Sequence, residues 1–324
     1  MYIIFSYGRK TMKIIIKNHQ ELQESVDYLV SKLKLEIKKD LIIEVKIAER
    51  DGYHIQKQQG YVTITYFHKH HFFAALMKVM SLSNETSYES YEQSHFDDLG
   101  LMLDTARNAV PQMDTIKKYI MILSLLGYNY LELYVEDVME VKEEPFYRYM
   151  RGKYAISDIK YLDEFSKKYG IELIPCIQTL AHLDGLFKHP EYREVNDIDD
   201  ILLVGHPKTY QLIENILKTT KEAFTSKKIN IGMDEAWKLG LGKYLSQNGF
   251  QNRLEIMKNH LERVLSLCKK YQYQPSMWAD MFFHLTTGSY HQEKVEFSQD
   301  VIDQIPKDVQ LIYWDYYRTE KKTY

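Results

Sequence analysis

Two adjacent carboxyl groups, Asp234 and Glu235, are the residues of this sequence best suited to acid–base chemistry. They follow a short apolar segment, residues 228–233 (KINIGM), and therefore stand where a strand is expected to end. Ionising one carboxyl makes ionising its neighbour costlier, so one of the two can remain protonated as a general acid. A solvated acidic pair at the start of a helix through Ala236 and Trp237 is the structural alternative. The dipeptide alone leaves both interpretations open.

Polar and aromatic residues also stand at the ends of five other apolar segments. The indole rings of Trp278 and Trp314 suit the apolar faces of a sugar, and the planar guanidinium of Arg107 can bind two neighbouring hydroxyl groups. Core tryptophans and a surface arginine are the alternatives. The remaining candidates at these positions are Asp104, Glu136, Asp137, Gln178, His182, Asp280, Asp315 and Tyr316.

The elements that must position these residues form repeated strand–helix units. Strands are expected at 99–104, 128–135, 171–178, 228–233, 274–279 and 309–314, and helices at 113–126, 156–169, 208–224 and 252–271. Such units predict a parallel sheet with helices outside it. No Gly-x-Gly-x-x-Gly follows any of the strands, which argues against a dinucleotide-binding fold. A (β/α)8-type TIM barrel is favoured, with the candidate residues at the carboxyl ends of its strands.

A small α/β sandwich domain is predicted to precede the barrel. Strands are expected at 12–17 and 41–48, followed by a hairpin of 53–56 with 61–66, and helices at 21–35 and 72–82, a pattern read as βαββα. The polar stretch 83–98 has the composition of a linker. The predicted domains are 1–90 for the small domain, 91–98 for the linker and 99–324 for the barrel.

The predicted barrel is incomplete, since six strands are found where a closed barrel of this type has eight. An open parallel sheet would leave unpaired edges. We therefore expect either a truncated chain that stops before the last two strands or two strands supplied from elsewhere.

Composition excludes several other classes of protein. Lys and Arg number 42 against 45 Asp and Glu, which argues against a nucleic-acid or polybasic membrane binder. Two cysteines, Cys176 and Cys268, are too few for a disulfide framework. No secretion signal or membrane span is seen, so a cytoplasmic location is expected. The histidines at 68, 70 and 71 resemble a metal tract but lack nearby carboxylates, and a solvated turn is favoured there.

Four segments together resemble the family 20 glycoside hydrolases, the β-N-acetylhexosaminidases, and look most like a divergent, mostly bacterial branch. They are residues 101–107 (LMLDTAR), 134–137 (YVED), 171–182 (IELIPCIQTLAH) and 232–235 (GMDE). The familial His-x-Gly-Gly-Asp-Glu motif appears here with Asn230 in place of the histidine and Met233 in place of the second glycine.

The resemblance implies a retaining mechanism in which the substrate's own acetamido group attacks the anomeric carbon. Glu235 would then be the general acid and base, and Asp234 would orient the acetamido group. Contacts to an N-acetylhexosamine-terminated oligosaccharide are implied for Arg107, His182, Trp278 and Trp314, and more weakly for Glu136, Asp137 and Tyr316. No metal or organic cofactor is required. Two alternatives remain, a two-carboxylate retaining glycosidase that pairs Glu235 with Asp280 and a truncated, non-catalytic carbohydrate-binding fragment.

Overall fold

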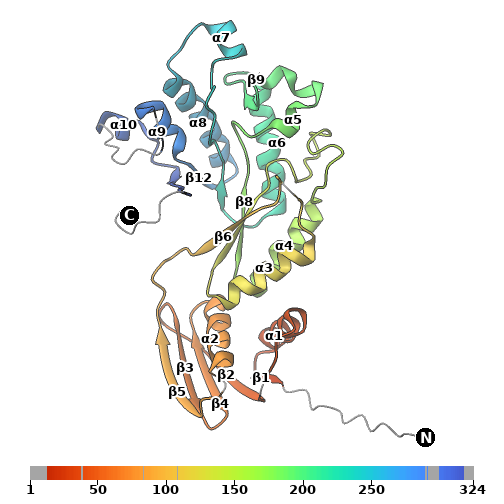
Figure 1. Cartoon of the computed structure of the whole chain (residues 1–324), viewed down its shortest axis with the longest axis vertical. Helices are drawn as coiled ribbons and strands as arrows, with labels where there is room; N and C mark the ends of the chain where they lie inside the picture. The colour runs from red at the N-terminus through yellow and green to blue at the C-terminus, as the bar shows by residue number, and fades with distance from the viewer. Residues whose placement is uncertain are drawn as a thin grey trace, which may run out of the picture. The chain divides into compact units, whose positions relative to one another are not determined.

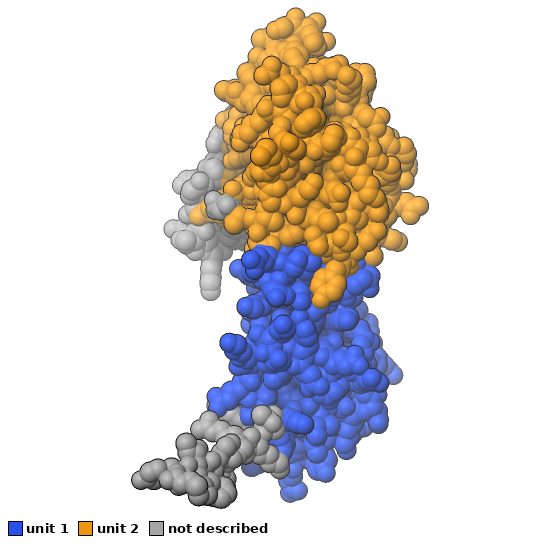
Figure 2. Space-filling view, turned by 90° about the vertical axis from the view of Figure 1, so that its right-hand side faces the viewer, with its two compact units in different colours: residues 1–101, 112–131, 162–172 blue, residues 102–111, 132–161, 173–324 orange. Residues whose placement is uncertain are grey.

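The computed structural model of this chain describes residues 13–37, 39–82, 84–107, 109–288, 290 and 299–316. Contacts divide the chain into two compact units, coloured blue and orange in Figure 2. Unit 1 comprises residues 1–101, 112–131 and 162–172, and unit 2 comprises residues 102–111, 132–161 and 173–324. Unit 1 thus contains the expected N-terminal domain and also residues 112–131 and 162–172, which the sequence analysis assigned to the barrel.

Unit 1 is built on a five-stranded sheet in the order β1-β2-β4-β3-β5 (Figure 1). β1 and β4 both run parallel to β2, and β3 runs antiparallel to β4 and β5. The strands are β1 (Ile14–Lys17), β2 (Leu41–Ile47), β3 (Tyr53–Gln58), β4 (Tyr61–Tyr66) and β5 (Ser87–Glu92).

Two helices of unit 1 follow from apolar periodicity. Within α1 (Gln20–Leu33), Leu22, Val26 and Leu29 recur every three or four residues and are fully buried. α2 (Lys69–Ser81) packs against β3 and β4, and also against α3 (Met113–Leu125). The predicted helices at 21–35, 72–82 and 113–126 are therefore confirmed to within a few residues.

Two expectations for this region are corrected. The element order is βαβββαβ rather than βαββα. Three strands, β2 and the two strands of the expected hairpin, lie between α1 and α2, and a further strand, β5, follows α2. β5 lies in the polar stretch 83–98 and ends at Glu92, inside the predicted linker 91–98. Its residues are mostly exposed, as in an edge strand that buries little of either face, so no apolar alternation marked it in the sequence.

The second sheet has six strands in the order β6-β7-β8-β11-β12-β13. β11 pairs in parallel with β8 and β12, and β12 pairs in parallel with β13. Hydrogen bonds from Asn129 to Leu99 and from Thr105 to Tyr134 give β6 and β7 the same direction. The strands are β6 (Gly100–Asp104), β7 (Tyr130–Tyr134), β8 (Glu172–Cys176), β11 (Lys228–Asn230), β12 (Gln274–Trp278) and β13 (Gln310–Ile312).

This sheet confirms the predicted architecture of an incomplete TIM barrel preceded by a small α/β domain. All six strands lie within the predicted segments, although three of them end two or three residues earlier than expected. Those residues, such as Ile231–Met233, leave the strand ladder and form the loops at the carboxyl ends of the strands. In a barrel these ends carry the functional residues.

The helices between the strands complete the described chain. α6 (Pro207–Ala223) and α8 (Arg253–Lys270) pack against each other, and α8 contacts β12. None of the described helices combines the length and the apolar character needed to cross a membrane. The remaining elements are α4 (Ile156–Lys168), α5 (Asp184–Phe187), the 3-10 helix η1 (Pro190–Val195), β9 (Asn196–Ile198), β10 (Ile201–Leu202), α7 (Lys243–Asn248), α9 (Asp280–Thr287) and α10 (Gln299–Gln304).

Candidate active site

A pocket of about 380 Å³ lies in unit 2, at the carboxyl ends of the barrel strands. Its lining comes from the ends of β6, β7 and β12 and from the loops that follow β6, β11 and β13. The sequence predicted nine site residues, namely the two acidic residues and seven residues with implied sugar contacts. Six of these nine line the pocket, together with three further residues. The predicted six are Arg107, Asp234, Glu235, Trp278, Trp314 and Tyr316, and the others are Met102, Asp104 and Tyr134.

A tight turn after β11 presents the two acidic residues to this pocket. Gly232 and Met233 have φ values of 72° and 70°, in the left-handed region that glycine tolerates best. The side chain of Asn230 accepts a hydrogen bond from the Gly232 N–H at 2.9 Å. A Cβ atom on Gly232 would lie 2.1 Å from Oε1 of Gln178, so no larger residue fits here without displacing the Gln178 amide.

Asp234 is held as an ionised hydrogen-bond acceptor. Its carboxylate oxygens accept from Gln178 Nε2 at 2.9 Å and contact His182 Nε2 at 3.0 Å. Burial opposes ionisation, but the hydrogen bond and positive charge of His182, together with the bond from Gln178, lower the pKa of Asp234 below its usual value. A negative charge is therefore stable at this wall of the pocket.

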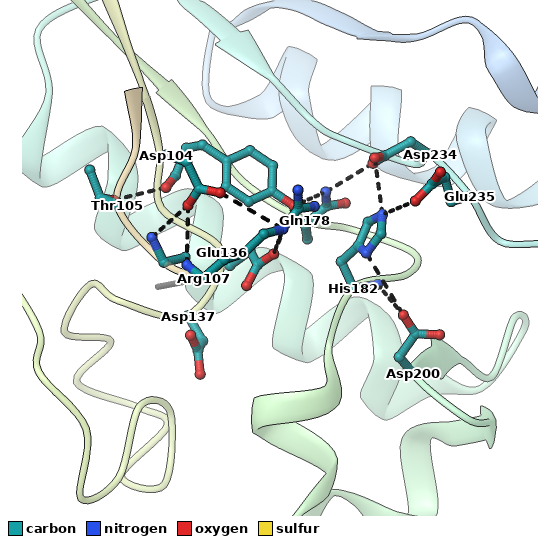
Figure 3. A network of polar contacts seen from close by, with 12 residues as sticks. Asp104, Thr105, Arg107, Glu136, Asp137, Gln178, His182, Asp200, Asp234 and Glu235 are labelled. Atoms are coloured by element: carbon teal, nitrogen blue, oxygen red, sulfur yellow. Dashed lines mark hydrogen bonds and ion pairs between the residues drawn. The ribbon is translucent and has the colours of Figure 1, made fainter. Parts of the chain in front are cut away.

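His182 connects Asp234 with Glu235 and with Asp200, as Figure 3 shows. Its Nε2 atom lies 3.5 Å from Oε2 of Glu235, and its backbone N–H donates to Asp200 Oδ2 at 2.9 Å. Burial alone would lower the pKa of His182, but the hydrogen bond and charge of Asp234 raise it. The Glu235 side chain is 40% exposed and can reach a bound molecule, whereas that of Asp234 is only 12% exposed.

The hydroxyl of Tyr134 joins Arg107 to this acidic cluster. It accepts hydrogen bonds from Arg107 Nη2 and Gln178 Nε2, both at 2.9 Å, and donates to Glu136 Oε1 at 2.8 Å. These three contacts use its one proton and both lone pairs. The guanidinium of Arg107 also stacks on the Tyr134 ring, 4.7 Å from its centroid. A continuous polar network thus runs from Arg107 through Tyr134 and Gln178 to Asp234. Figure 3 labels the members Arg107, Gln178 and Asp234.

Sequence reasoning missed the roles of Tyr134 and Gln178. Tyr134 is the last residue of β7 and was assigned to the apolar strand, although an aromatic hydroxyl at a strand end was a usable signal. Gln178 was recognised at a strand end but was not included among the site residues. Both side chains act through hydrogen bonds to residues distant in the sequence, which no local pattern reveals.

The structure corrects the predicted sugar contacts of Glu136 and Asp137. Glu136 does not line the pocket; it accepts hydrogen bonds from Tyr134 and from Arg107 Nε, at 3.3 Å, and so supports the arginine. Asp137 is buried and pairs with Arg148 at 2.7 Å and with Arg151 at 3.3 Å. In Figure 3 its carboxylate points away from the cluster. Consecutive residues after a strand point in different directions, and only the first of these two supports the site.

Aromatic side chains form the opposite part of the pocket. Trp278 and Trp314 both line it. Tyr290 supports Trp314 by a ring contact at 4.7 Å and by a 2.7 Å hydrogen bond from the Trp314 backbone N–H. Tyr316 is 82% exposed, and its ring centroid lies 5.3 Å from that of Trp314, so it contributes to the rim of the pocket rather than to a buried wall.

Asp280 cannot serve as the second carboxylate of a two-carboxylate mechanism. It is fully buried, does not line the pocket, and accepts the backbone N–H of Glu235 at 2.9 Å. The alternative that pairs Glu235 with Asp280 across a substrate is therefore wrong, because a substrate cannot reach the Asp280 carboxylate.

Two clusters contain groups that can bind metals. Ligand atoms of His182, Asp234 and Glu235 lie within 4.8 Å of one another, and one imidazole with two carboxylates is a donor set that suits a divalent transition metal.

The histidines at the start of α2 are not a solvated turn as predicted. His70 and His71 are buried, and His71 bonds to Ser94 Oγ at 2.8 Å and accepts the backbone N–H of His68. The His71 ring thus caps the start of the helix, and the His70 ring is buried beside it.

Residues 96–323 match the glycosyl hydrolase family 20, catalytic domain. The chain therefore belongs to this family, and the resemblance seen in the sequence is confirmed. It is 25% identical over 226 residues to hexosaminidase D of Homo sapiens, which covers 65% of this chain and 43% of the human protein. It is 22% identical over 251 residues to a probable beta-hexosaminidase of Arthroderma benhamiae, covering 67% and 38% of the two chains. The chain thus spans less than half the length of these two relatives.

Solved structures share the fold of this chain. The GH20 β-N-acetylhexosaminidase of Streptomyces coelicolor superposes with a TM-score of 0.71 at 18% identity, covering 96% of this chain and 67% of that one. The GH20 exo β-N-acetylglucosaminidase of Vibrio harveyi, solved in complex with N-acetylglucosamine, gives 0.70 at 16% identity and covers 94% and 54%.

Proposed function

We propose that this chain carries the catalytic site of a retaining exo-β-N-acetylhexosaminidase that removes terminal β-linked N-acetylglucosamine or N-acetylgalactosamine from glycans. The observation that carries the proposal is the pairing of an ionised, buried Asp234 with an accessible Glu235 in one pocket. Membership of glycosyl hydrolase family 20 supports the reaction class, and the V. harveyi relative, a complex with N-acetylglucosamine, supports the sugar.

In the first step, the acetamido oxygen of the substrate attacks the anomeric carbon and the glycosidic C–O bond breaks. Glu235 donates its proton to the departing oxygen, and the acetamido group becomes a positively charged oxazolinium ring. Asp234 accepts the acetamido N–H and balances the positive charge that develops there. His182 keeps Asp234 ionised for this task.

In the second step, Glu235 removes a proton from water, and the water oxygen attacks the anomeric carbon from the face that the leaving group vacated. The oxazolinium ring opens, so the product has the configuration of the substrate and Glu235 is protonated again. Arg107, held by Tyr134 and Glu136, would bind hydroxyl groups of the terminal sugar in its planar fork. Trp278 and Trp314 would enclose the acetamido group.

The test is hydrolysis of an aryl N-acetyl-β-glucosaminide by this chain and its Glu235→Gln variant. Loss of the general acid and base should lower kcat by about 10²-fold or more. Glu191→Gln, which removes an exposed carboxyl on η1, is the matched control and should retain full activity. Near-normal turnover by Glu235→Gln would refute the acid assignment.

Two further measurements separate the alternatives. Asp234→Asn should slow even an aryl glycoside with a good leaving group, because the acetamido attack itself is impaired. A thiazoline mimic of the oxazolinium ring should inhibit the wild-type chain. Binding of the mimic without any hydrolysis would favour the non-catalytic carbohydrate-binding alternative over the enzyme.

A further inference from the structure

The backbone of Glu235 adopts a conformation that a residue with a side chain rarely takes. Its φ is 52°, in the left-handed region, and such conformations persist only where the surroundings hold them. The Glu235 carbonyl accepts the N–H of Trp237 at 2.7 Å. The Glu235 N–H donates to Oδ2 of Asp280 at 2.9 Å. The side chain of the proposed acid therefore starts from a backbone that is held on both sides.

Of the two hydrogen bonds that hold the Glu235 backbone, the one to Asp280 joins residues far apart in the sequence. Asp280 is the first residue of α9 and follows Trp278, which lines the pocket, by two positions. The Asp280 residue is fully buried. A carboxylate that accepts a backbone N–H makes a stronger hydrogen bond than a neutral acceptor does. Asp280 thus links the turn after β11 to the carboxyl end of β12, from the side of the turn that substrate does not reach.

The buried position of Asp280 disfavours the ionised form of its carboxyl group. Burial raises the pKa of Asp280 to about 6, and the negative charge of Asp234 acts in the same direction. Hydrogen bonds from the Glu235 N–H and from the Trp314 side chain act against these effects and lower the pKa. An apolar residue would avoid the desolvation but would leave the partly buried Glu235 N–H without this acceptor. The buried Asp280 carboxyl therefore holds the amide of Glu235 and the side chain of Trp314 despite the unfavourable burial of its charge.

We propose that Asp280 is a positioning residue that fixes the orientation of Glu235 for proton transfer to the leaving group. The inference rests on the proposed function, in which Glu235 is the general acid. Asp280 does not line the pocket, and it reaches the site through the Glu235 backbone N–H and through a hydrogen bond with the side chain of Trp314. The contact with Glu235 is the one that can orient the general acid. Displacing a reacting group by about 1 Å can cost about 10²-fold in rate. Loss of the contact should therefore weaken acid catalysis more than it weakens sugar binding.

The test measures kcat/KM for aryl N-acetyl-β-glucosaminides that differ in the pKa of the phenol leaving group. An activated phenol leaves without help from an acid, whereas a poor leaving group needs the proton of Glu235. Asp280→Ala should lower kcat/KM by about 10²-fold for the poorest leaving group and much less for the most activated one. Asp280→Asn retains an oxygen that can accept the same N–H and should recover a large part of this loss.

A purely structural role gives a different pattern. If Asp280→Ala lowers kcat/KM by the same factor for every leaving group, the positioning role is wrong. It is also wrong if Asp280→Asn, folded as judged by circular dichroism, responds to the leaving group as Asp280→Ala does. If Asp280→Ala fails to fold, Asp280→Asn decides, because its neutral oxygen makes a weaker hydrogen bond to the Glu235 N–H. Its smaller loss of kcat/KM should be greatest for the poorest leaving group, and an equal loss, or none, for every leaving group would overturn the positioning role.

A second readout separates this inference from the proposed function. Amide hydrogen exchange at Glu235 reports the hydrogen bond directly and needs no activity. Asp280→Ala should accelerate exchange at this amide selectively, with the amides of the α8 core around Val264 unchanged. If the wild-type chain hydrolyses no aryl N-acetylglucosaminide, the proposed function fails, and unchanged exchange at Glu235 would separately overturn the contact on which the inference depends.

Discussion

The Nε2 atom of His182 lies 3.0 Å from Oδ2 of Asp234, and this contact sets the charge of both residues. The pKa of Asp234 is lowered and the pKa of His182 is raised, each against the effect of its own burial. The contact therefore favours a negative carboxylate beside a positive imidazolium. That carboxylate is the one proposed to orient the acetamido group.

His182→Ala should move the acid limb of the pH profile of kcat/KM to higher pH. Without the imidazole, burial dominates and the pKa of Asp234 rises, so that Asp234 becomes protonated at a higher pH than in the wild type. The measurement is the pH dependence of kcat/KM for the wild type and for His182→Ala. His54→Ala, in the N-terminal sheet, is the control and should leave the profile unchanged. An unshifted acid limb in His182→Ala would contradict the assignment.

Gly232→Ala should destabilise the protein and lower its activity. The new Cβ would lie 2.1 Å from Gln178 Oε1, and the residue would keep a φ of 72° that alanine disfavours. Gly205→Ala is the matched control, since its φ is 87° but its Cβ would meet nothing within 4 Å. The free energy of unfolding, measured by urea denaturation, should fall by about 1 kcal/mol in Gly205→Ala and by about 1–3 kcal/mol more in Gly232→Ala. Equal losses in the two variants would show that the close approach to Gln178 is absent.

Glu132→Gln should change how stability depends on pH. Glu132 lies on β7, is only 8% exposed, and burial raises its pKa from 4.5 to about 7. Between these values the folded protein binds more protons than the unfolded chain, so this residue lowers the stability as the pH rises. Glutamine does not titrate, so it does not cause this loss. The free energy of unfolding of Glu132→Gln minus that of the wild type should therefore be up to about 3 kcal/mol larger at pH 8 than at pH 4.5.

Urea denaturation at the two pH values measures this difference, and Glu191→Gln, with its exposed carboxyl, provides the baseline. A stability offset between Glu132→Gln and the wild type that is the same at both pH values would contradict the buried, protonated state of Glu132.

Arg148→Met should destabilise the fold, whereas Arg107→Met should mainly impair binding. The Arg148 side chain is 4% exposed and neutralises Asp137, so removing it leaves a buried charge with one partner fewer, at an expected loss of about 3–5 kcal/mol. The Arg107 side chain is 50% exposed, and its loss should change stability by less than about 1 kcal/mol while raising KM. Thermal unfolding and steady-state kinetics on the two variants give the comparison. A large KM effect with unchanged stability in Arg148→Met would place Asp137 back in the substrate site.

Much of the fold followed from local patterns. Each barrel strand is a short apolar run and each long helix an amphipathic one, because burial on one side of an element repeats with its geometry. β5 was missed for the same reason, since a mostly exposed edge strand leaves no apolar repeat. The buried His70 and His71 were misjudged because histidines near a helix start are usually solvated, whereas here the helix packs both rings inside unit 1.

The candidate site was predictable only in part. Residues at strand ends converge in any barrel, and so Arg107, Trp278 and Trp314 were found without knowledge of their contacts. Whether a strand-end carboxyl faces the pocket depends on its partners across the sheet. Glu136 and Asp137 are neighbours in sequence, yet the first holds Arg107 and the second holds Arg148.

The sequence by itself determined that Asp234 and Glu235 leave the same strand end, because adjacent residues cannot be separated by folding. It also determined the order and kind of the six barrel strands and of the long helices between them, since apolar periodicity is a property of each element alone. Only the tertiary structure decided that Tyr134 and Gln178 connect Arg107 to Asp234, that His182 lies against both acids, and that Asp280 holds the backbone beneath them. The physical reason is that hydrogen bonds require a fixed distance and direction, which for residues far apart in the chain are set by strand register and side-chain packing.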